Sequence, residues 1–272
     1  MNEQQFLQNY SQDRYDRPSI ATDIAAFSLR TVKSEAYRAS PEPKLCVLLV
    51  RRGGHPFKDH WALPGGFLQR GESIDECAFR ELKEETNLQP VSMLWVDTFS
   101  QPDRDPRGWI ISHAYASVIA EEDAKIVGGS DAAEAQWFEV TFQEKSKDCW
   151  HLSLQSGETV LSAILQAAPS ATAKTRFAIL ENQGLAFDHA SILASALETL
   201  RREGEKIETV FAFLPEKFTL FTLQKVQETL LGISLLTANF RRKIADFVEE
   251  TDEYTFGAGH RPARLFRKKI TI

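Results

Sequence analysis

The chain has 272 residues, of which 43% are hydrophobic and 26% are charged, as expected for a folded globular protein long enough for two domains. Its longest wholly apolar run, residues 45–50, is far too short to cross a membrane, and the polar start lacks the basic and apolar segments of a secretion signal. Three cysteines without metal-binding spacing fit a reducing cytoplasm, so we expect a cytoplasmic protein.

The charge is distributed unevenly along the chain. Its total of −6 argues against a protein that binds nucleic acid over its whole surface. Residues 1–200 hold 19 basic and 28 acidic side chains, whereas residues 201–272 hold 13 basic and 10 acidic ones. The net charge therefore changes from −9 to +3, which predicts two parts with different tasks.

The first two thirds of the chain reads as a series of strands around one helix. Residues 19–32 have strand character, and residues 44–52 are short and rich in Val and Leu, as in a buried strand. Residues 91–99, 109–119 and 135–140 read as further strands. Ser156-Gly157 separates two alternating runs and predicts a hairpin of residues 149–155 with 158–165.

The helix of this part is expected to begin at residue 74. Ser73 and Glu76 have the spacing of a capping box. At 3.6 residues per turn, Glu81, Glu84 and Glu85 fall within one arc of the helix surface. The flanking apolar residues are expected to face the core: Ala78, Phe79 and Leu82.

Three carboxylates in one arc repel one another, which helix stability does not require. A hard divalent cation, Mg²⁺ or Mn²⁺, would remove the repulsion, since these ions prefer oxygen ligands and share them with phosphates. Such an ion could polarise a phosphate and activate a water molecule. A solvated acidic face is the better explanation for any single glutamate, but the complete spacing favours a metal site.

The stretch of residues 66–88 resembles the Nudix box, whose pattern is G-x5-E-x7-R-E-U-x-E-E-x-G-U, where U is aliphatic. The matching residues are Gly66, Glu72, Arg80, Glu81, Leu82, Glu84, Glu85 and Leu88. Asn87 stands where the family has Gly. Asn is the commonest other residue in a left-handed backbone conformation, so we expect only the end of the helix to differ.

The resemblance implies an α/β fold, the Nudix α/β/α sandwich, and a divalent ion, Mg²⁺ or Mn²⁺. It would assign metal binding to Gly66, Glu81, Glu84 and Glu85, and catalytic roles to Glu72, Arg80, Glu81 and Glu85. In the family the arginine orients a carboxylate and the early glutamate steadies the loop. Which carboxylate acts as the base stays open, and a glutamate outside the box is an alternative.

A charged turn at residues 103–108 and two aromatic residues are candidates for ligand binding. Arg104 and Arg107 could hold a phosphate or a terminal ribose, with a solvated loop as the equal alternative. The turn also resembles the corresponding loop of Nudix proteins that handle ADP-ribose or related dinucleotides. Phe57 and Trp61 could stack on an adenine, with a position in the core as the alternative.

The last part of the chain predicts three helices. The first follows Asp188, its expected cap, and ends at Gly204; its apolar stripe is a core face or a dimer contact. The second, residues 223–231, is expected to be capped by Thr222 and the third, residues 238–247, by Thr237. Three apolar side chains are expected on the inner face of the third helix: Phe240, Ile244 and Phe247.

Two short helices joined by a tight turn, with basic residues early in the second, predict a helix-turn-helix. Cations near a helix start oppose the macrodipole, a cost that contact with phosphates would explain. Residues 254–269 alternate turn residues with arginines, like a β-wing along a DNA backbone. The predicted DNA contacts are Thr237, Asn239, Arg241, Arg242, Lys243, Arg261 and Arg264. A basic surface for protein contacts is the alternative.

Together, the box and the basic tail resemble the Nudix-related transcriptional regulators, in which a Nudix sensor is fused to a winged helix-turn-helix. The resemblance implies a Nudix domain at residues 1–184, a linker helix at 185–204 and a winged helix-turn-helix domain at 205–272. It also implies ADP-ribose or a related nucleotide as effector, NAD metabolism genes or sugar genes as targets, and a homodimer on double-stranded DNA, away from membranes. The alternative is an active Mg-dependent pyrophosphohydrolase of ADP-ribose or another nucleoside diphosphate derivative. The operator and the sign of regulation stay open.

Overall fold

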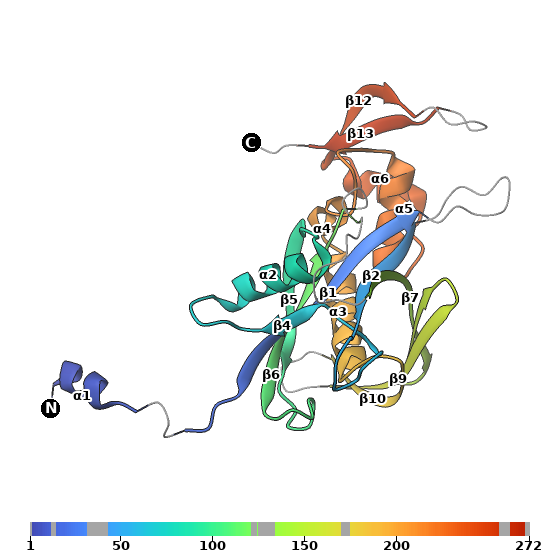
Figure 1. Cartoon of the computed structure of the whole chain (residues 1–272). Coiled ribbons are helices and arrows are strands. Elements are labelled where there is room, and N and C mark those ends of the chain that lie inside the picture. Colours follow the sequence, from blue (N-terminus) through green and yellow to red (C-terminus); the bar gives the residue numbers. More distant parts are fainter. Residues whose placement is uncertain are drawn as a thin grey trace.

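The computed structural model describes residues 2–11, 15–31, 43–120, 124, 134–169, 175–255 and 262–269. A short helix, α1 (Glu3–Asn9), lies on an N-terminal arm that extends away from the rest of the chain (Figure 1). Arg261, one of the predicted DNA contacts, lies outside the described residues. None of the described helices is long and apolar enough to span a membrane.

The described strands form a ten-stranded sheet and a separate three-stranded sheet. The large sheet has the order β10-β9-β8-β7-β2-β1-β6-β5, with β3 beside β2 and β4 beside β1. Neighbouring strands are antiparallel except β1 and β6, which are parallel. The strands are β1 (Ser19–Thr31), β2 (Pro43–Arg51), β3 (Trp61–Ala62), β4 (Gly65–Phe67), β5 (Ser92–Phe99), β6 (Ile110–Val118), β7 (Glu134–Ser146), β8 (Cys149–Ser156), β9 (Thr159–Pro169) and β10 (Thr175–Gln183).

Two helices, α2 (Ile74–Thr86) and α3 (His189–Glu203), pack in different layers, so the central strands are buried on both faces. Successive side chains of a strand point to opposite faces. In β1, Ile24 and Ala26 therefore pack in the cluster that includes Leu82 of α2, whereas Ala25 and Phe27 pack in the cluster that includes α3. The α/β/α sandwich predicted from the sequence is confirmed.

The C-terminal part begins after α3 and packs on the end of that helix (Figure 1). Its elements are α4 (Ile207–Phe211), β11 (Lys217–Phe218), α5 (Leu220–Leu231), α6 (Thr237–Ile244), β12 (Val248–Tyr254) and β13 (Arg264–Lys268). The small sheet has the order β11-β13-β12. Leu200 of α3, Leu230 of α5 and Phe240 of α6 belong to one apolar cluster, so both parts of the chain share a core. The predicted winged helix-turn-helix arrangement is confirmed.

Several predicted helix ends were wrong. Helix α5 begins after Thr219 and not after Thr222. The Thr219 hydroxyl caps the helix by accepting from the Thr222 amide at 3.0 Å, and Leu220, the first helical residue, packs against the core. Thr237 is the first residue of α6 and does not cap it. Phe247 lies beyond the end of α6 and is 41% exposed, and its carbonyl accepts a bond from the Lys269 amide at 2.9 Å.

Candidate functional site

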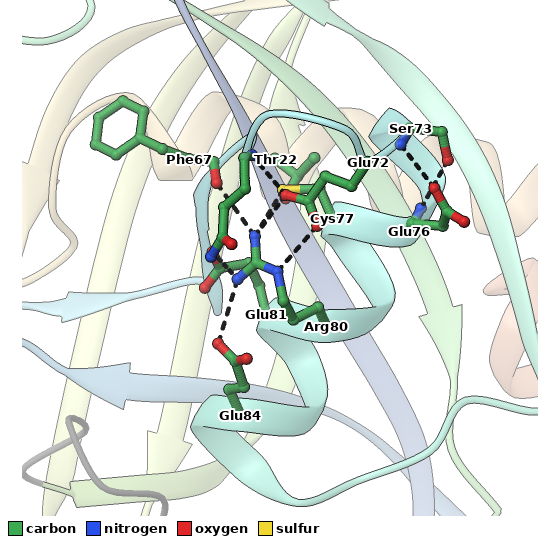
Figure 2. Close-up of polar contacts among 10 residues, drawn as sticks. Thr22, Phe67, Glu72, Ser73, Glu76, Cys77, Arg80, Glu81 and Glu84 are labelled. Carbon is green, nitrogen blue, oxygen red and sulfur yellow. Dashed lines mark hydrogen bonds and ion pairs between the residues drawn. The ribbon is translucent and has the colours of Figure 1, made fainter.

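Helix α2 has the ends that the sequence predicts. The Ser73 hydroxyl accepts from the Glu76 amide at 3.3 Å, and the Glu76 carboxylate accepts from the Ser73 amide at 2.7 Å (Figure 2). The helix ends at Asn87, whose φ of 57° and ψ of 18° are left-handed, so Asn replaces Gly there without changing the helix end. Phe79 is 48% exposed, so the prediction that it faces the core was wrong.

Arg80 is the centre of the polar contacts on α2 (Figure 2). Its Nε and Nη2 donate to Glu72 at 3.0 and 2.7 Å, and its Nη1 donates to Glu81 at 2.7 Å and to Glu84 at 3.2 Å. The bonds from Arg80, followed by one from the Gln69 amide, lower the pKa of Glu72 to about 2. The bonds to Glu72 in turn raise the pKa of Arg80. The loop before α2 is therefore anchored to the helix by a charged pair.

The contacts of Arg80 reduce the repulsion among the glutamates, so this repulsion does not by itself require a metal ion. Arg80 supplies a positive charge to Glu81 and Glu84 within the protein itself. In the described part of the chain, no three acidic, His or Cys side chains converge in the way that a bound ion requires. The glutamates lie on the predicted face, and Arg80 bonds to one oxygen each of Glu81 and Glu84, which leaves a second oxygen on each carboxylate for a cation.

Glu85 is the box carboxylate whose ionised form is least favoured by the protein alone. Its Oε2 accepts a bond from the Gly65 amide at 3.1 Å. Its pKa is raised to about 8, mainly by burial and also by Glu81 and Asp23, against the opposing effects of the Gly65 amide and Arg52. A divalent ion would favour the ionised form. Oxygen donors on Glu81, Glu84, Glu85 and Gly66 fit a hard divalent cation.

Gly65 and Gly66 allow β4 to approach both β1 and α2. A Cβ atom on Gly66 would lie 2.3 Å from Oε1 of Glu81, and one on Gly65 would lie 2.1 Å from the carbonyl oxygen of Thr22. Both distances are well below contact distance, so neither position accepts a side chain without movement. The pair brings backbone to the edge of the carboxylate face.

A cavity of about 210 Å³, here called the polar pocket, is lined in part by Gly65 and Gly66, which neighbour Glu85 and Glu81. Its lining includes Asp23, Arg52, Arg104, Arg107, Phe187 and His189. Sequence reasoning missed Arg52, although an arginine directly after a buried strand was a usable signal. Arginines and backbone amides beside a carboxylate face suit a phosphate that shares a metal ion.

The two predicted arginines have different positions. Arg107 lines the polar pocket; its side chain is 42% exposed and binds Asp105 at 2.7 Å. The side chain of Arg104 is only 4% exposed and binds Asp188 at 2.8 Å and Asp23 at 3.2 Å. The interpretation of the turn as a solvated loop is therefore wrong for Arg104. Asp188 occupies the N-cap position of α3, but its side chain makes no capping bond because it binds Arg104.

The two predicted aromatic residues also differ. Trp61 is 7% exposed and packs against Phe138, with ring centroids 4.8 Å apart, so it occupies the core position that the sequence left open. Phe57 is partly buried and packs against Phe187 of the polar pocket, with ring centroids 4.8 Å apart. Phe57 therefore borders the pocket through Phe187.

A larger cavity of about 410 Å³ lies between the end of β5, β10 and the first turns of α3. Its walls include Phe99, Phe177 and Ile179 and are mainly apolar. Arg104 lines both cavities and separates them together with Asp188. Although this cavity is larger, a phosphate group fits the polar pocket better, since three arginines and the two glycines beside Glu81 and Glu85 line that pocket.

The predicted DNA contacts lie on the surface of the C-terminal part. Thr237, Asn239, Arg241, Arg242 and Lys243 are all exposed on α6. Arg264 on β13 is bonded to Glu250 and to the Tyr254 hydroxyl. The strand β12 thus supplies acidic partners to the wing that sequence reasoning missed. The cations of α6 are more available for an anionic partner than Arg264.

Two family profiles match the chain in separate regions. The NUDIX domain profile matches residues 36–147, and the profile of the NrtR DNA-binding winged helix domain matches residues 210–268. The ADPR responsive transcriptional repressor NtrR of Acinetobacter baylyi is 28% identical over 270 residues, 98% of this chain and 88% of that protein. The ADP-ribose pyrophosphatase of Methanocaldococcus jannaschii is 36% identical over 136 residues, 50% of this chain and 79% of that protein.

Solved structures show the same two-part arrangement. Shewanella oneidensis NrtR complexed with a 27mer DNA superposes with a TM-score of 0.62 and 26% sequence identity. The match covers 92% of this chain and 93% of that one. The similarity therefore extends over the sandwich, α3 and the C-terminal part together.

The contact between Gly66 and Glu81 generates a first prediction. Gly66→Ala should push the Glu81 carboxylate aside and weaken Mn²⁺ binding by about tenfold or more, with the fold retained. Electron paramagnetic resonance titration measures the free ion, and circular dichroism measures the fold. Gly54→Ala is the matched control, since a Cβ there meets nothing within 4 Å. Equal Mn²⁺ affinity in both variants would contradict the prediction.

The raised pKa of Glu85 generates a second prediction. A carboxyl whose pKa is raised from 4.5 to about 8 by folding stabilises the protein below pH 4.5, and this stability is lost as pH rises toward 8. In metal-free buffer Glu85→Gln should therefore melt above the parent at pH 8, with a smaller difference at pH 5. Thermal melts test this, with exposed Glu205→Gln as control. A difference that stays constant with pH would count against it.

Proposed function

The chain belongs to the Nudix family, and because it also carries the winged helix domain of the NrtR type, we propose that it is an ADP-ribose-responsive transcriptional repressor. The observation that carries the proposal is the combination on one chain of an arginine-lined pocket beside the Nudix carboxylates and an exposed cationic helix, α6. The NtrR repressor of Acinetobacter baylyi is similar over nearly the whole of this chain. As a DNA-binding regulator, the protein would act in the cytoplasm.

The effector would bind through its diphosphate. Arg52 and Arg107 line the polar pocket and can pair with phosphate oxygens, while Gly65 and Gly66 allow close approach of the backbone. Nudix hydrolases use divalent metal ions, and we assign Mg²⁺ to Glu81, Glu84, Glu85 and Gly66 of this chain. The ion would neutralise phosphate charge and, in a hydrolase, activate water.

The C-terminal part would bind double-stranded DNA through α6. Asn239, Arg241, Arg242 and Lys243 are exposed, and polar and cationic side chains on a recognition helix contact base edges and phosphates. We propose a homodimer on a palindromic site, since helix-turn-helix dimers bind two half-sites. The proposed domains are residues 1–184 and 205–272, joined by a linker at 185–204.

The second candidate function is hydrolysis of ADP-ribose or another nucleoside diphosphate derivative. The observation that favours it is the complete box, in which Glu72, Arg80, Glu81, Glu84 and Glu85 are all present on one helix and its loop. The ADP-ribose pyrophosphatase of Methanocaldococcus jannaschii is similar to the sandwich part of this chain. The two functions are compatible, because each uses the same pocket.

Substitution of an exposed arginine on α6 should weaken DNA binding without affecting the effector site. Arg242→Ala should lower affinity for a duplex selected by the parent from a random library by about tenfold, with ADP-ribose binding unchanged. Gel shifts and calorimetry measure the two affinities. Arg176→Ala, exposed on β10, is the matched control. Failure of the parent to select any duplex at moderate salt would remove the repressor proposal.

Incubation with ADP-ribose and Mg²⁺ tests the second function. If the protein is a hydrolase, AMP and ribose 5-phosphate should accumulate, and Glu84→Gln should abolish the reaction while DNA affinity stays unchanged. Chromatography of the products measures the reaction. No AMP from the parent, with ADP-ribose binding retained, would leave a sensor without hydrolase activity.

A further inference from the structure

Three arginines that line the polar pocket all contact two consecutive residues just before α3. The Cζ atoms of Arg52 and Arg107 lie 4.8 and 5.3 Å from the centre of the Phe187 ring. Arg104 donates to Asp188 through Nε at 3.0 Å and through Nη2 at 2.8 Å. An anion that enters the pocket therefore competes with Phe187 and Asp188 for these cations, and also with Asp105 for Arg107 and with Asp23 for Arg104.

The start of α3 has a backbone conformation that favours a second arrangement. Phe187 has a φ of 49°, which is rare and strained for a residue with a large side chain. Asp188 is at the N-cap position, where an aspartate normally accepts from the first free amides of the helix. Here its carboxylate makes no such bond and binds Arg104 instead. The His189, Ser191 and Ile192 amides already bond to backbone carbonyls, so if Arg104 leaves, the Ala190 amide is the capping partner that the first turn offers the carboxylate.

The first residue of α3 is also connected to the carboxylate face. The Leu63 amide donates to Nδ1 of His189 at 2.8 Å, and two residues later the Gly65 amide donates to Glu85 at 3.1 Å. The other ring nitrogen of His189, Nε2, lies 3.4 Å from Asp23, which also binds Arg104. Changes at Glu85 or in the pocket thus reach the same end of α3.

The other end of α3 contacts the C-terminal part. The helix has 15 residues and is about 22 Å long, and most of its side chains are buried. The carbonyl of Gly204 accepts from Gln227 of α5 at 3.2 Å. The guanidinium of Arg201 lies beside Gly232, the left-handed end of α5 in the turn that precedes α6. Displacement of α3 is therefore transmitted to α5 and to the turn before α6.

We propose that Phe187 and Asp188 form the switch through which a nucleoside diphosphate in the polar pocket changes DNA affinity. The inference rests on the proposed function and names its regulatory residues. The diphosphate draws Arg52, Arg104 and Arg107 onto its phosphates, and Asp188 then turns to cap α3. Because the released carboxylate gains a capping bond from the Ala190 amide, it is not left buried without a partner. The start of α3 shifts, and α5 and α6 shift with it.

The test measures the coupling factor, which is the ratio of DNA dissociation constants with and without saturating ADP-ribose and Mg²⁺. The parent should give a change of about fivefold or more. Asp188→Asn removes the charge that holds Arg104 but keeps a side chain that can cap. Without ligand, this variant should already have the DNA affinity of the ligand-bound parent, and it should bind ADP-ribose more tightly, since coupling is reciprocal.

Glu198→Gln is the matched control, since it makes the same charge change on α3 away from the pocket and should keep the parent's coupling factor. A merely structural role for Asp188 would weaken both affinities together. An unchanged coupling factor in Asp188→Asn, with the parent coupled, would overturn the switch and leave the proposed function intact. No effect of ADP-ribose on the parent would remove the proposed function and the switch with it.

A measurement on the parent protein covers the case in which Asp188→Asn does not fold. Hydrogen exchange of the Ala190 amide should slow when ADP-ribose and Mg²⁺ bind, because capping would give this amide a partner, whereas the Ser191 and Ile192 amides already bond to the Asp188 carbonyl. Exchange that is equal or faster in the complex, under conditions where calorimetry shows binding, would overturn the proposed capping.

Discussion

The burial of Arg104 between Asp23 and Asp188 is the interaction on which the arrangement of the pocket depends. Its side chain is 4% exposed, and its two partners come from β1 and from the residue before α3. Removing one partner of such a buried pair costs about 3–5 kcal/mol, since the other charge is left unpaired. Apolar side chains of similar volume are often as stabilising. Stability alone therefore does not account for charges at this position, whereas control by an anionic ligand does.

Helix α2 also pairs an arginine with carboxylates, but these side chains are more exposed than Arg104. Arg80 holds Glu72, Glu81 and Glu84, so the helix is stable without an ion and its loop is anchored in advance. Glu85 is the exception, because it is buried and its pKa is raised to about 8. A cation that approaches this face would favour the ionised form of Glu85 and could bind the second oxygens of Glu81 and Glu84 while Arg80 keeps the first.

Much of the architecture was predictable from local sequence. The capping box at Ser73, the glutamate spacing on α2 and the hairpin at Ser156-Gly157 depend on residues near one another in the chain, and the structure has all three. The ends of α5 and α6 were less predictable. Thr219 and Thr222 are both able to cap, and the choice between them depends on whether Leu220 packs against a distant core.

The resemblance to the Nudix family predicted the fold class, and helical periodicity predicted the carboxylate face of α2 and the cationic surface of α6. Long-range contacts were needed to show that Arg104 is buried on Asp188, that Trp61 belongs to the core and that Arg52 lines the pocket. The partners of Arg104 are 81 and 84 residues away in sequence. The local sequence around an arginine is the same whether its side chain is hydrated or paired with a distant carboxylate. Tertiary packing therefore determines whether the arginine is exposed or buried.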